Sequence, residues 1–168
     1  MNLETFTEFI KNNQDKLYRF ALSITKDPAT AQDVVQEVFI KIWNQGQEVK
    51  IENLAAWAMR LTRNLSIDKT RLKSKSFDSL GKAAEMQNKS ADPMRNTMAK
   101  DAAEKIRQFI EELPVKQRNI IHLREIEEMT YEEISEILEV PIEQVKVYLY
   151  RARKVIRQKY LKINAYGI

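Results

Sequence analysis

The strongest chemical signal in the sequence is a cluster of basic side chains near its C-terminus. Seven lysines or arginines lie between Lys146 and Lys162, with no acidic residue among them. Seven glutamates lie between Glu125 and Glu139, with no basic residue among them. So abrupt a change of charge separates a supporting surface from one that attracts a polyanion. The pattern is typical of a helix-turn-helix that binds DNA, although a solvated basic helix would also produce the charge run by itself.

Smaller signals around this charge change support the helix-turn-helix interpretation. Such a unit needs a small residue in its first helix, a turn residue four positions later and an apolar residue six beyond that. Ser135, Glu139 and Val145 stand at these positions. Thr130 and Glu133 predict a capping box at the start of the first helix. Glycine is favoured where a turn needs a positive φ, so Glu139 there predicts a strain on the order of 1 kcal/mol.

The second helix of this unit separates a buried seam from an outward face when residues are placed at 100° intervals. The predicted seam consists of Val145, Leu149, Ala152 and Ile156. The predicted DNA contacts are Glu143, Gln144, Lys146, Val147, Tyr150, Arg151, Arg153 and Lys154. Near the start of the helix, Gln144 suits adenine and Val147 a thymine methyl group, and Lys146 would also reach base edges. The later cations would meet phosphates and make binding depend on salt.

A second basic cluster lies on another predicted helix. Its members are Arg60, Arg63, Lys69, Arg71, Lys73 and Lys75, and Asp68 is the only acid between Met59 and Lys75. Cations at this density can follow nucleic-acid phosphates, and the interleaved Asn64 and Ser66 could hydrogen-bond to bases. Taken alone, the cluster is explained equally well by a solvated helix end.

The sequence offers no constellation for catalysis or metal binding. It has no cysteine, and its single histidine, His122, has no neighbours at ligand spacing. It also lacks a glycine-rich phosphate loop, a Ser–His pair and an HExxH motif. We therefore expect no enzyme activity, no metal and no cofactor. Trp43 and Trp57 are expected to pack in the core rather than to stack on bases.

Composition also bounds the class of protein and its compartment. The apolar content of 43% fits a globular chain, and the formal net charge of +4 is only mildly basic. The first 14 residues lack the regions of a signal peptide, and no apolar run approaches the roughly 18 residues of a membrane span. A chain without cysteine suits a reducing compartment. We expect a cytoplasmic protein that does not insert into a membrane.

The elements that must position these side chains are predicted to be helices, because three glycines and four prolines leave little material for hairpins. The clearest helix follows Asp27 and Pro28, an N-cap and a first helical residue. Its apolar stripe consists of Ala31, Val34, Val35, Val38, Phe39, Ile42 and Trp43. The expected fold is all-α, with two small helical domains at residues 1–72 and 100–168. A flexible linker over 73–99 joins them, and the helix-turn-helix lies in the second domain.

Four segments of the chain together resemble the extracytoplasmic-function (ECF) sigma factors of bacterial RNA polymerase. They are DPATAQDVVQEVFIKIW, NLAAWAMRLTRNLSIDKTRLK, ELPVKQRNIIHLREIEEMTYEEISEIL and VPIEQVKVYLYRARKVIR. They cover both conserved sigma domains in order, over nearly the whole chain. The resemblance implies a protein that binds core polymerase and directs promoter-specific initiation by reading the −10 and −35 elements.

The resemblance also implies roles for particular residues and partners. Asp33, Gln36, Glu37 and Lys41 would dock on the clamp helices of the polymerase β′ subunit. Arg60, Arg63, Asn64, Lys69 and Arg71 would read and open the −10 element, where a melted strand needs cations. The helix-turn-helix would read the −35 duplex, and the glutamate-rich segment before it would contact the β flap. A separate anti-sigma factor is a further expectation from the family.

Two other interpretations remain open from the residues alone. One is a DNA-binding regulator that never contacts polymerase, although such regulators usually dimerise and no dimerisation helix is evident. The other is an adaptor whose basic faces bind an acidic protein.

Overall fold

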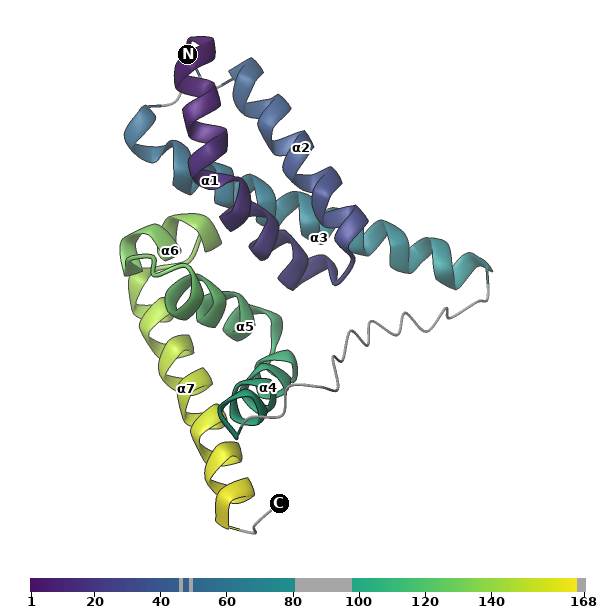
Figure 1. Cartoon of the computed structure of the whole chain (residues 1–168), viewed down its shortest axis with the longest axis vertical. Helices are drawn as coiled ribbons and strands as arrows, with labels where there is room; N and C mark the ends of the chain where they lie inside the picture. The colour runs from purple at the N-terminus through teal and green to yellow at the C-terminus, as the bar shows by residue number, and fades with distance from the viewer. Residues whose placement is uncertain (46, 49, 81–97, 166–168) are drawn as a thin grey trace.

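The computed structural model describes residues 1–45, 47–48, 50–80 and 98–165. Every regular element in these residues is helical, which confirms the all-α prediction (Figure 1). The N-terminal bundle consists of α1 (Leu3–Thr25), α2 (Pro28–Gln45), a short 3₁₀ turn η1 (Ile51–Asn53) and α3 (Leu54–Leu80). The C-terminal bundle consists of α4 (Met98–Glu111), α5 (Val115–Ile121), the π-helical segment η2 (His122–Ile126), α6 (Tyr131–Leu138) and α7 (Ile142–Ala165).

The capping residues predicted from the sequence stand at the starts of α2 and α6. The backbone N–H of Thr30 donates to Asp27 Oδ2 over 3.3 Å, and Pro28 is the first residue of α2. At α6 both bonds of the capping box are present: Glu133 N–H donates to Thr130 Oγ1 (3.1 Å), and Thr130 N–H donates to Glu133 Oε2 (2.8 Å). Side chains therefore satisfy backbone donors that would otherwise have no partner.

Helix α3 is longer than the sequence predicted. It continues through residues 73–80, which belong to the predicted linker, and α4 already begins at Met98. The sequence contains no glycine or proline between Leu54 and Leu80, and Gly81 follows at once. Nothing in this stretch interrupts the helix before that glycine. The rest of the predicted linker, residues 81–97, lies outside the described residues.

The apolar stripe of α2 fills the core of the N-terminal bundle, as its spacing predicted. Its buried members are Ala31, Val34, Val35, Val38 and Ile42. Trp43 departs from the prediction, because 44% of it is exposed and it lies with its ring 4.9 Å from that of Phe6. Trp57 is only partly buried. Trp43 is one residue, or 100°, beyond the buried Ile42, so it reaches only the edge of the core.

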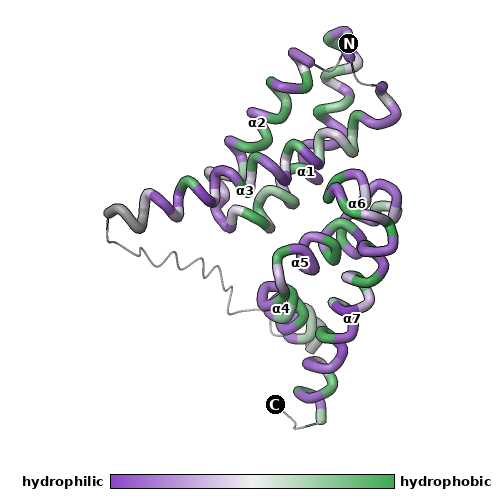
Figure 2. Tube along the Cα trace, turned by 180° about the vertical axis from the view of Figure 1, so that it is seen from behind, coloured by the Kyte–Doolittle hydropathy of each residue, from purple (hydrophilic) through white to green (hydrophobic). Residues whose placement is uncertain are grey.

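The two bundles pack against each other rather than standing apart on a tether. Figures 1 and 2 view the molecule from opposite sides, and both show α6 beside the N-terminal bundle with α7 leading away from it. Helix α6 packs on α3, and η2 packs on α1. Buried side chains from both bundles form one continuous hydrophobic cluster. The sequence predicted the two units but not their contact.

Candidate nucleic-acid and polymerase interfaces

Helices α6 and α7 form the predicted helix-turn-helix. Glu139 ends α6 in the left-handed region (φ 56°, ψ 42°), which confirms the positive φ expected at the turn. Ser135 Oγ donates to the Val140 carbonyl over 2.6 Å and closes the turn from the other side. Val145 is fully buried at the start of α7. The three positions that defined the motif in the sequence therefore all perform their structural roles.

The outward face of α7 presents the predicted DNA contacts to solvent. The seam residues Val145, Leu149 and Ala152 are buried. All eight predicted contacts are exposed: Glu143, Gln144, Lys146, Val147, Tyr150, Arg151, Arg153 and Lys154. Val147 is 45% exposed and Tyr150 67%, so packing does not explain these two apolar side chains. An open groove of about 480 Å³ runs along the face, and Lys146, Arg153, Lys154 and Arg157 are among its lining residues.

Arg153 differs from the other predicted phosphate contacts because it is already paired. Its Nε donates to Glu125 Oε1 over 2.7 Å, and its terminal nitrogen contacts the same oxygen. Glu125 belongs to η2, within the glutamate-rich segment. That segment therefore holds one of the basic side chains of α7 in position instead of serving only as a separate surface. Both side chains are about half exposed, so the pair is weak and open to competition from a phosphate.

The basic cluster on α3 is divided between faces. At 100° per residue, Arg60, Asn64 and Arg71 share one face, while Lys69 lies on the opposite side. There it pairs with Glu37 of α2 over 3.2 Å, so the structure does not group it with the others. Ser66 was expected to reach bases and does not, because it is completely buried.

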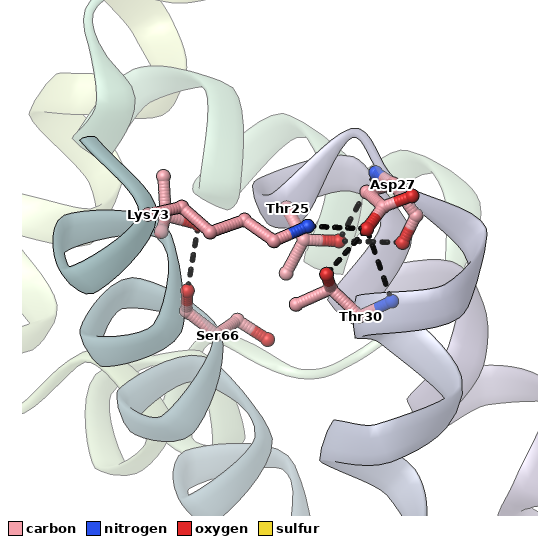
Figure 3. A network of polar contacts seen from close by, with 6 residues as sticks. Thr25, Asp27, Thr30, Ser66 and Lys73 are labelled. Carbon is pink, nitrogen blue, oxygen red and sulfur yellow. Dashed lines mark hydrogen bonds and ion pairs between the residues drawn. The ribbon is translucent and has the colours of Figure 1, made fainter. Parts of the chain in front are cut away.

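Lys73 of α3 contacts Asp27 at the start of α2 and so links the two helices (Figure 3). Its Nζ donates to Asp27 Oδ2 over 2.5 Å, and the same carboxylate accepts from the backbone and hydroxyl of Thr30. These hydrogen bonds, that from Lys73 first, lower the pKa of Asp27 to about 2. We conclude that Lys73 fixes α3 to the start of α2.

The predicted polymerase-docking residues lie on the outward side of α2. Asp33 and Gln36 are exposed, and Glu37 and Lys41 are partly buried. Ile40 lies four residues after Gln36 and is 60% exposed, so the same face carries a bare aliphatic side chain. Sequence reasoning missed Ile40 because it looked for polar residues there, although the spacing from Asp33 and Gln36 would have identified it.

A buried charged group was also missed. Within the glutamate-rich segment, the side chain of Glu127 is completely buried beside Arg19 and His122. Burial by itself would raise the pKa of Glu127, but hydrogen bonds from His122 and Arg19 outweigh it and hold the pKa at about 2. No local sequence signal marks this residue, because its partner Arg19 stands 108 positions away.

No group of three or more His, Cys, Asp or Glu is placed to hold a metal ion among the described residues. No helix in the same residues is both long and apolar enough to cross a membrane.

Comparison with known proteins identifies both bundles. Residues 9–76 match the family Sigma-70 region 2, and residues 103–156 match the family Sigma-70, region 4. Together the matched ranges cover most of the chain and leave the segment around residues 81–97 between them. Helix α6 and the first part of α7 lie within region 4, and the predicted docking residues of α2 and the basic cluster of α3 lie within region 2.

Similar curated proteins and solved structures agree with this assignment. The chain is 26% identical to the ECF RNA polymerase sigma factor SigW of Bacillus subtilis, across 93% of this chain and 89% of that protein. It is 29% identical to SigM of the same organism, across 93% and 95%. The fold is similar to that of the sigma factor RpoE from Bartonella quintana, in complex with the anti-sigma factor NepR. That structure has a TM-score of 0.74 and 24% identity over 96% of this chain and 99% of the other.

A second solved structure is CnrH in complex with the cytosolic domain of CnrY, with a TM-score of 0.68 and 20% identity over 94% and 88% of the two chains. The regions, their order and the full-length relatives all point to one class of protein. The chain belongs to the extracytoplasmic-function sigma factors of the sigma-70 family, the subunits that bind core RNA polymerase and promoter DNA and direct promoter-specific initiation of transcription.

Proposed function

We propose that α7 reads the −35 element as duplex DNA, with Gln144, Lys146 and Val147 at base edges. The observation that carries this assignment is the contrast between the two sides of α7. Val145, Leu149 and Ala152 are buried, while every predicted contact on the other side is exposed. A helix supported along one side and bare on the other can enter the major groove. Arg151 and Lys154, further along, would meet phosphates.

Run-off transcription with purified core polymerase and a mapped promoter tests this reading. Gln144→Ala is expected to change the preferred base at one −35 position, with a discrimination of about 1–3 kcal/mol lost there. Lys154→Ala serves as the matched control, because loss of a phosphate contact weakens all sequences alike and reduces the salt dependence of binding. Equal weakening of every −35 variant by both substitutions would contradict the base-reading role of Gln144.

We further propose that the face of α3 with Arg60, Asn64 and Arg71 reads and opens the −10 element, with Arg63 beside it. Single-stranded DNA is bound by cations along its backbone and by side chains that hydrogen-bond to unpaired bases. Arg71→Ala is suited to the test, because Arg71 is exposed. It should slow promoter opening, followed by permanganate reactivity of unpaired thymines, while binding to an isolated −35 duplex stays unchanged.

The outward face of α2 is proposed to dock on the β′ clamp helices. Asp33, Gln36 and Ile40 would make the central contacts, since all three are exposed on one side of the helix. Asp33→Lys should reduce association with core polymerase at least about tenfold, as expected for a reversed charge inside an interface. Glu8→Lys makes the same charge change on an exposed part of α1 and should not. Equal loss from both variants would show only a net-charge effect.

Several further assignments complete the proposal. The glutamate-rich segment of the C-terminal bundle would contact the β flap. The protein would act in the cytoplasm, where it meets polymerase, and would need neither a cofactor nor catalytic residues of its own. An anti-sigma factor is proposed because the two solved relatives were captured with a partner, NepR or CnrY. A co-purifying polypeptide that suppresses run-off transcription with core enzyme would identify it.

A further inference from the structure

The C-terminal bundle contains an open apolar groove on the side of α7 that faces α4. Helices α4 and α5 both pack on α7, and side chains from all three line the groove, whose volume is about 350 Å³. Ile106 is 36% exposed, so the apolar floor is accessible to solvent. Pockets of about 300–1,000 Å³ with apolar walls are typical of small-molecule sites. We call it the isoleucine groove, because its floor consists of Ile106 and Ile110 of α4, Ile121 of α5 and Ile156 of α7.

Cationic side chains stand along one edge of the isoleucine groove. Arg153 and Arg157 of α7 line this edge together with Glu125 of η2. Glu125 is the ion-pair partner of Arg153, whereas Arg157 is exposed and forms no ion pair with any described residue. Tyr160, about one turn beyond Arg157, adds a hydroxyl that can donate a hydrogen bond. An apolar floor bordered by an unpaired cation suits a ligand with an apolar chain and one negative charge.

The same two arginines also line the groove on the DNA-reading face of α7. Arg153 and Arg157 are lining residues both of the isoleucine groove and of the 480 Å³ groove beside Lys146 and Tyr150. They therefore form a ridge between an apolar surface and a surface proposed to meet DNA. The guanidinium of the exposed Arg157 can meet an anion on either side of this ridge, and a head group that binds it competes with a DNA phosphate.

We propose that the isoleucine groove binds a medium-chain fatty carboxylate, which competes with promoter phosphate for Arg157. The chain would lie on the four isoleucines, because burial of methylene groups drives such binding. The carboxylate would lie at Arg157 rather than at Arg153, where Glu125 would repel it. The competition rests on the proposed function, which places α7 at the −35 element. Accumulation of such carboxylates would then weaken the grip of the protein on promoter DNA.

The size of the isoleucine groove favours a single chain over a protein helix. A helix that binds in a groove presents apolar anchors over two or more turns. Ile106 and Ile110 line the groove over only one turn of α4, and its volume of about 350 Å³ lies near the lower end for small-molecule sites. The unpaired cation at its edge selects an anionic head group over a neutral or cationic one.

The first test measures binding to the full chain through ¹³C-labelled isoleucine methyl groups. Dodecanoate, kept below its micelle concentration, should shift the methyl signals of the four groove isoleucines saturably and leave Ile42 of α2 unchanged. It should bind at least about tenfold more tightly than octanoate, because each buried methylene contributes up to about fourfold in affinity. The proposal is overturned if these signals do not shift. It is also overturned if they shift only on raising the protein concentration, which identifies a second copy as the occupant, or only with anionic lipid vesicles.

Two matched pairs of variants separate the head group from the chain. Arg157→Gln should weaken dodecanoate binding about three- to fivefold, as expected for an exposed ion pair. Arg107→Gln makes the same charge change on α4 outside the groove and should leave the affinity unchanged. Ile106→Glu should weaken binding at least about tenfold, whereas Leu3→Glu, on exposed α1, should not. Circular dichroism establishes that each variant is folded. Equal weakening by the two arginine variants would overturn the head-group contact.

A further measurement keeps the ligand site separate from the proposed function. Saturating dodecanoate should weaken binding to a −35 duplex about three- to fivefold, and the duplex should weaken dodecanoate binding by the same factor, because coupling between two sites is reciprocal. Arg157→Gln should abolish this coupling, and Arg107→Gln should retain it. Dodecanoate that binds without any effect on duplex affinity would overturn the competition. Failure of the proposed function differs, because the protein would then bind no −35 duplex while the methyl shifts persisted.

Discussion

The turn residue Glu139 allows strain and charge to be measured separately. With φ 56° and ψ 42°, its backbone lies in the left-handed region, which costs a residue with a Cβ roughly 1–2 kcal/mol. Glycine would relieve this cost, but it would also increase the conformational entropy of the unfolded chain, which lowers the free energy of unfolding by about 0.4–1 kcal/mol. The net gain expected for Glu139→Gly is therefore about 0.5–1 kcal/mol relative to Glu139→Ala, which keeps the Cβ.

The alanine variant is the proper reference because both substitutions remove the ion pair with Arg60. That pair is partly exposed, so its loss is expected to cost no more than about 1 kcal/mol. Urea unfolding followed by circular dichroism should place the glycine variant above the alanine variant in stability. In thermal unfolding the same difference corresponds to about 1–4 °C for a chain of this size. A glycine variant equal to or less stable than the alanine variant would show that the turn is not strained.

Three further predictions concern packing, acid stability and the charge pair on α7. Ile42→Ala should lower the free energy of unfolding by about 2–5 kcal/mol, because Ile42 is fully buried. Ile40 lies on the same helix but is 60% exposed, so Ile40→Ala should change the free energy of unfolding by about 0.5 kcal/mol or less. Urea titration measures both changes. Because the pKa of Glu127 is lowered to about 2, its contribution is present above about pH 5 and lost as the pH falls toward 2, by up to about 3 kcal/mol. Acid titration should therefore show a shallower loss of stability in Glu127→Gln than in the wild type, and an identical slope would refute the assignment. Glu125→Gln should release Arg153 and tighten binding to a −35 duplex by at most about fivefold at low salt. Arg153→Ala should weaken this binding. If both substitutions tightened binding, a phosphate contact from Arg153 would be excluded.

Local sequence signals predicted the elements of the fold because each depends on neighbours within a few positions. The capping box of Thr130 and Glu133 and the start of α2 at Pro28 were identified correctly. Of the predicted seam of α7, Val145, Leu149 and Ala152 are buried and Ile156 is only partly buried. The positive φ of Glu139 also followed from its place in the motif. The same reasoning placed Trp43 too deep, because a helical stripe indicates a direction and not how far the neighbouring helices extend.

The exposure of the candidate DNA-binding side chains was predicted less well, because it depends on which other helices pack against them. The exposure of all eight residues on the outward side of α7 was predicted correctly, since the buried seam decides which side of a single helix faces solvent. On α3, availability depended on neighbouring side chains, because Lys69 forms an ion pair with Glu37 of α2 and Ser66 is completely buried. A charge count along the chain cannot distinguish a lysine that pairs with another helix from one that is free to bind DNA.

By itself, the sequence determined an all-α chain, its helix-turn-helix, its basic faces and its family resemblance. These properties follow from the spacing and type of residues close together in the chain. Only the tertiary structure decided that the two bundles share one hydrophobic cluster and that Glu127 is buried against Arg19, 108 positions away. Such a contact leaves no local pattern, because burial of a charge is tolerated only where a distant partner supplies hydrogen bonds. Which DNA-binding side chains are free and which are covered was therefore decided by the packing of the bundles.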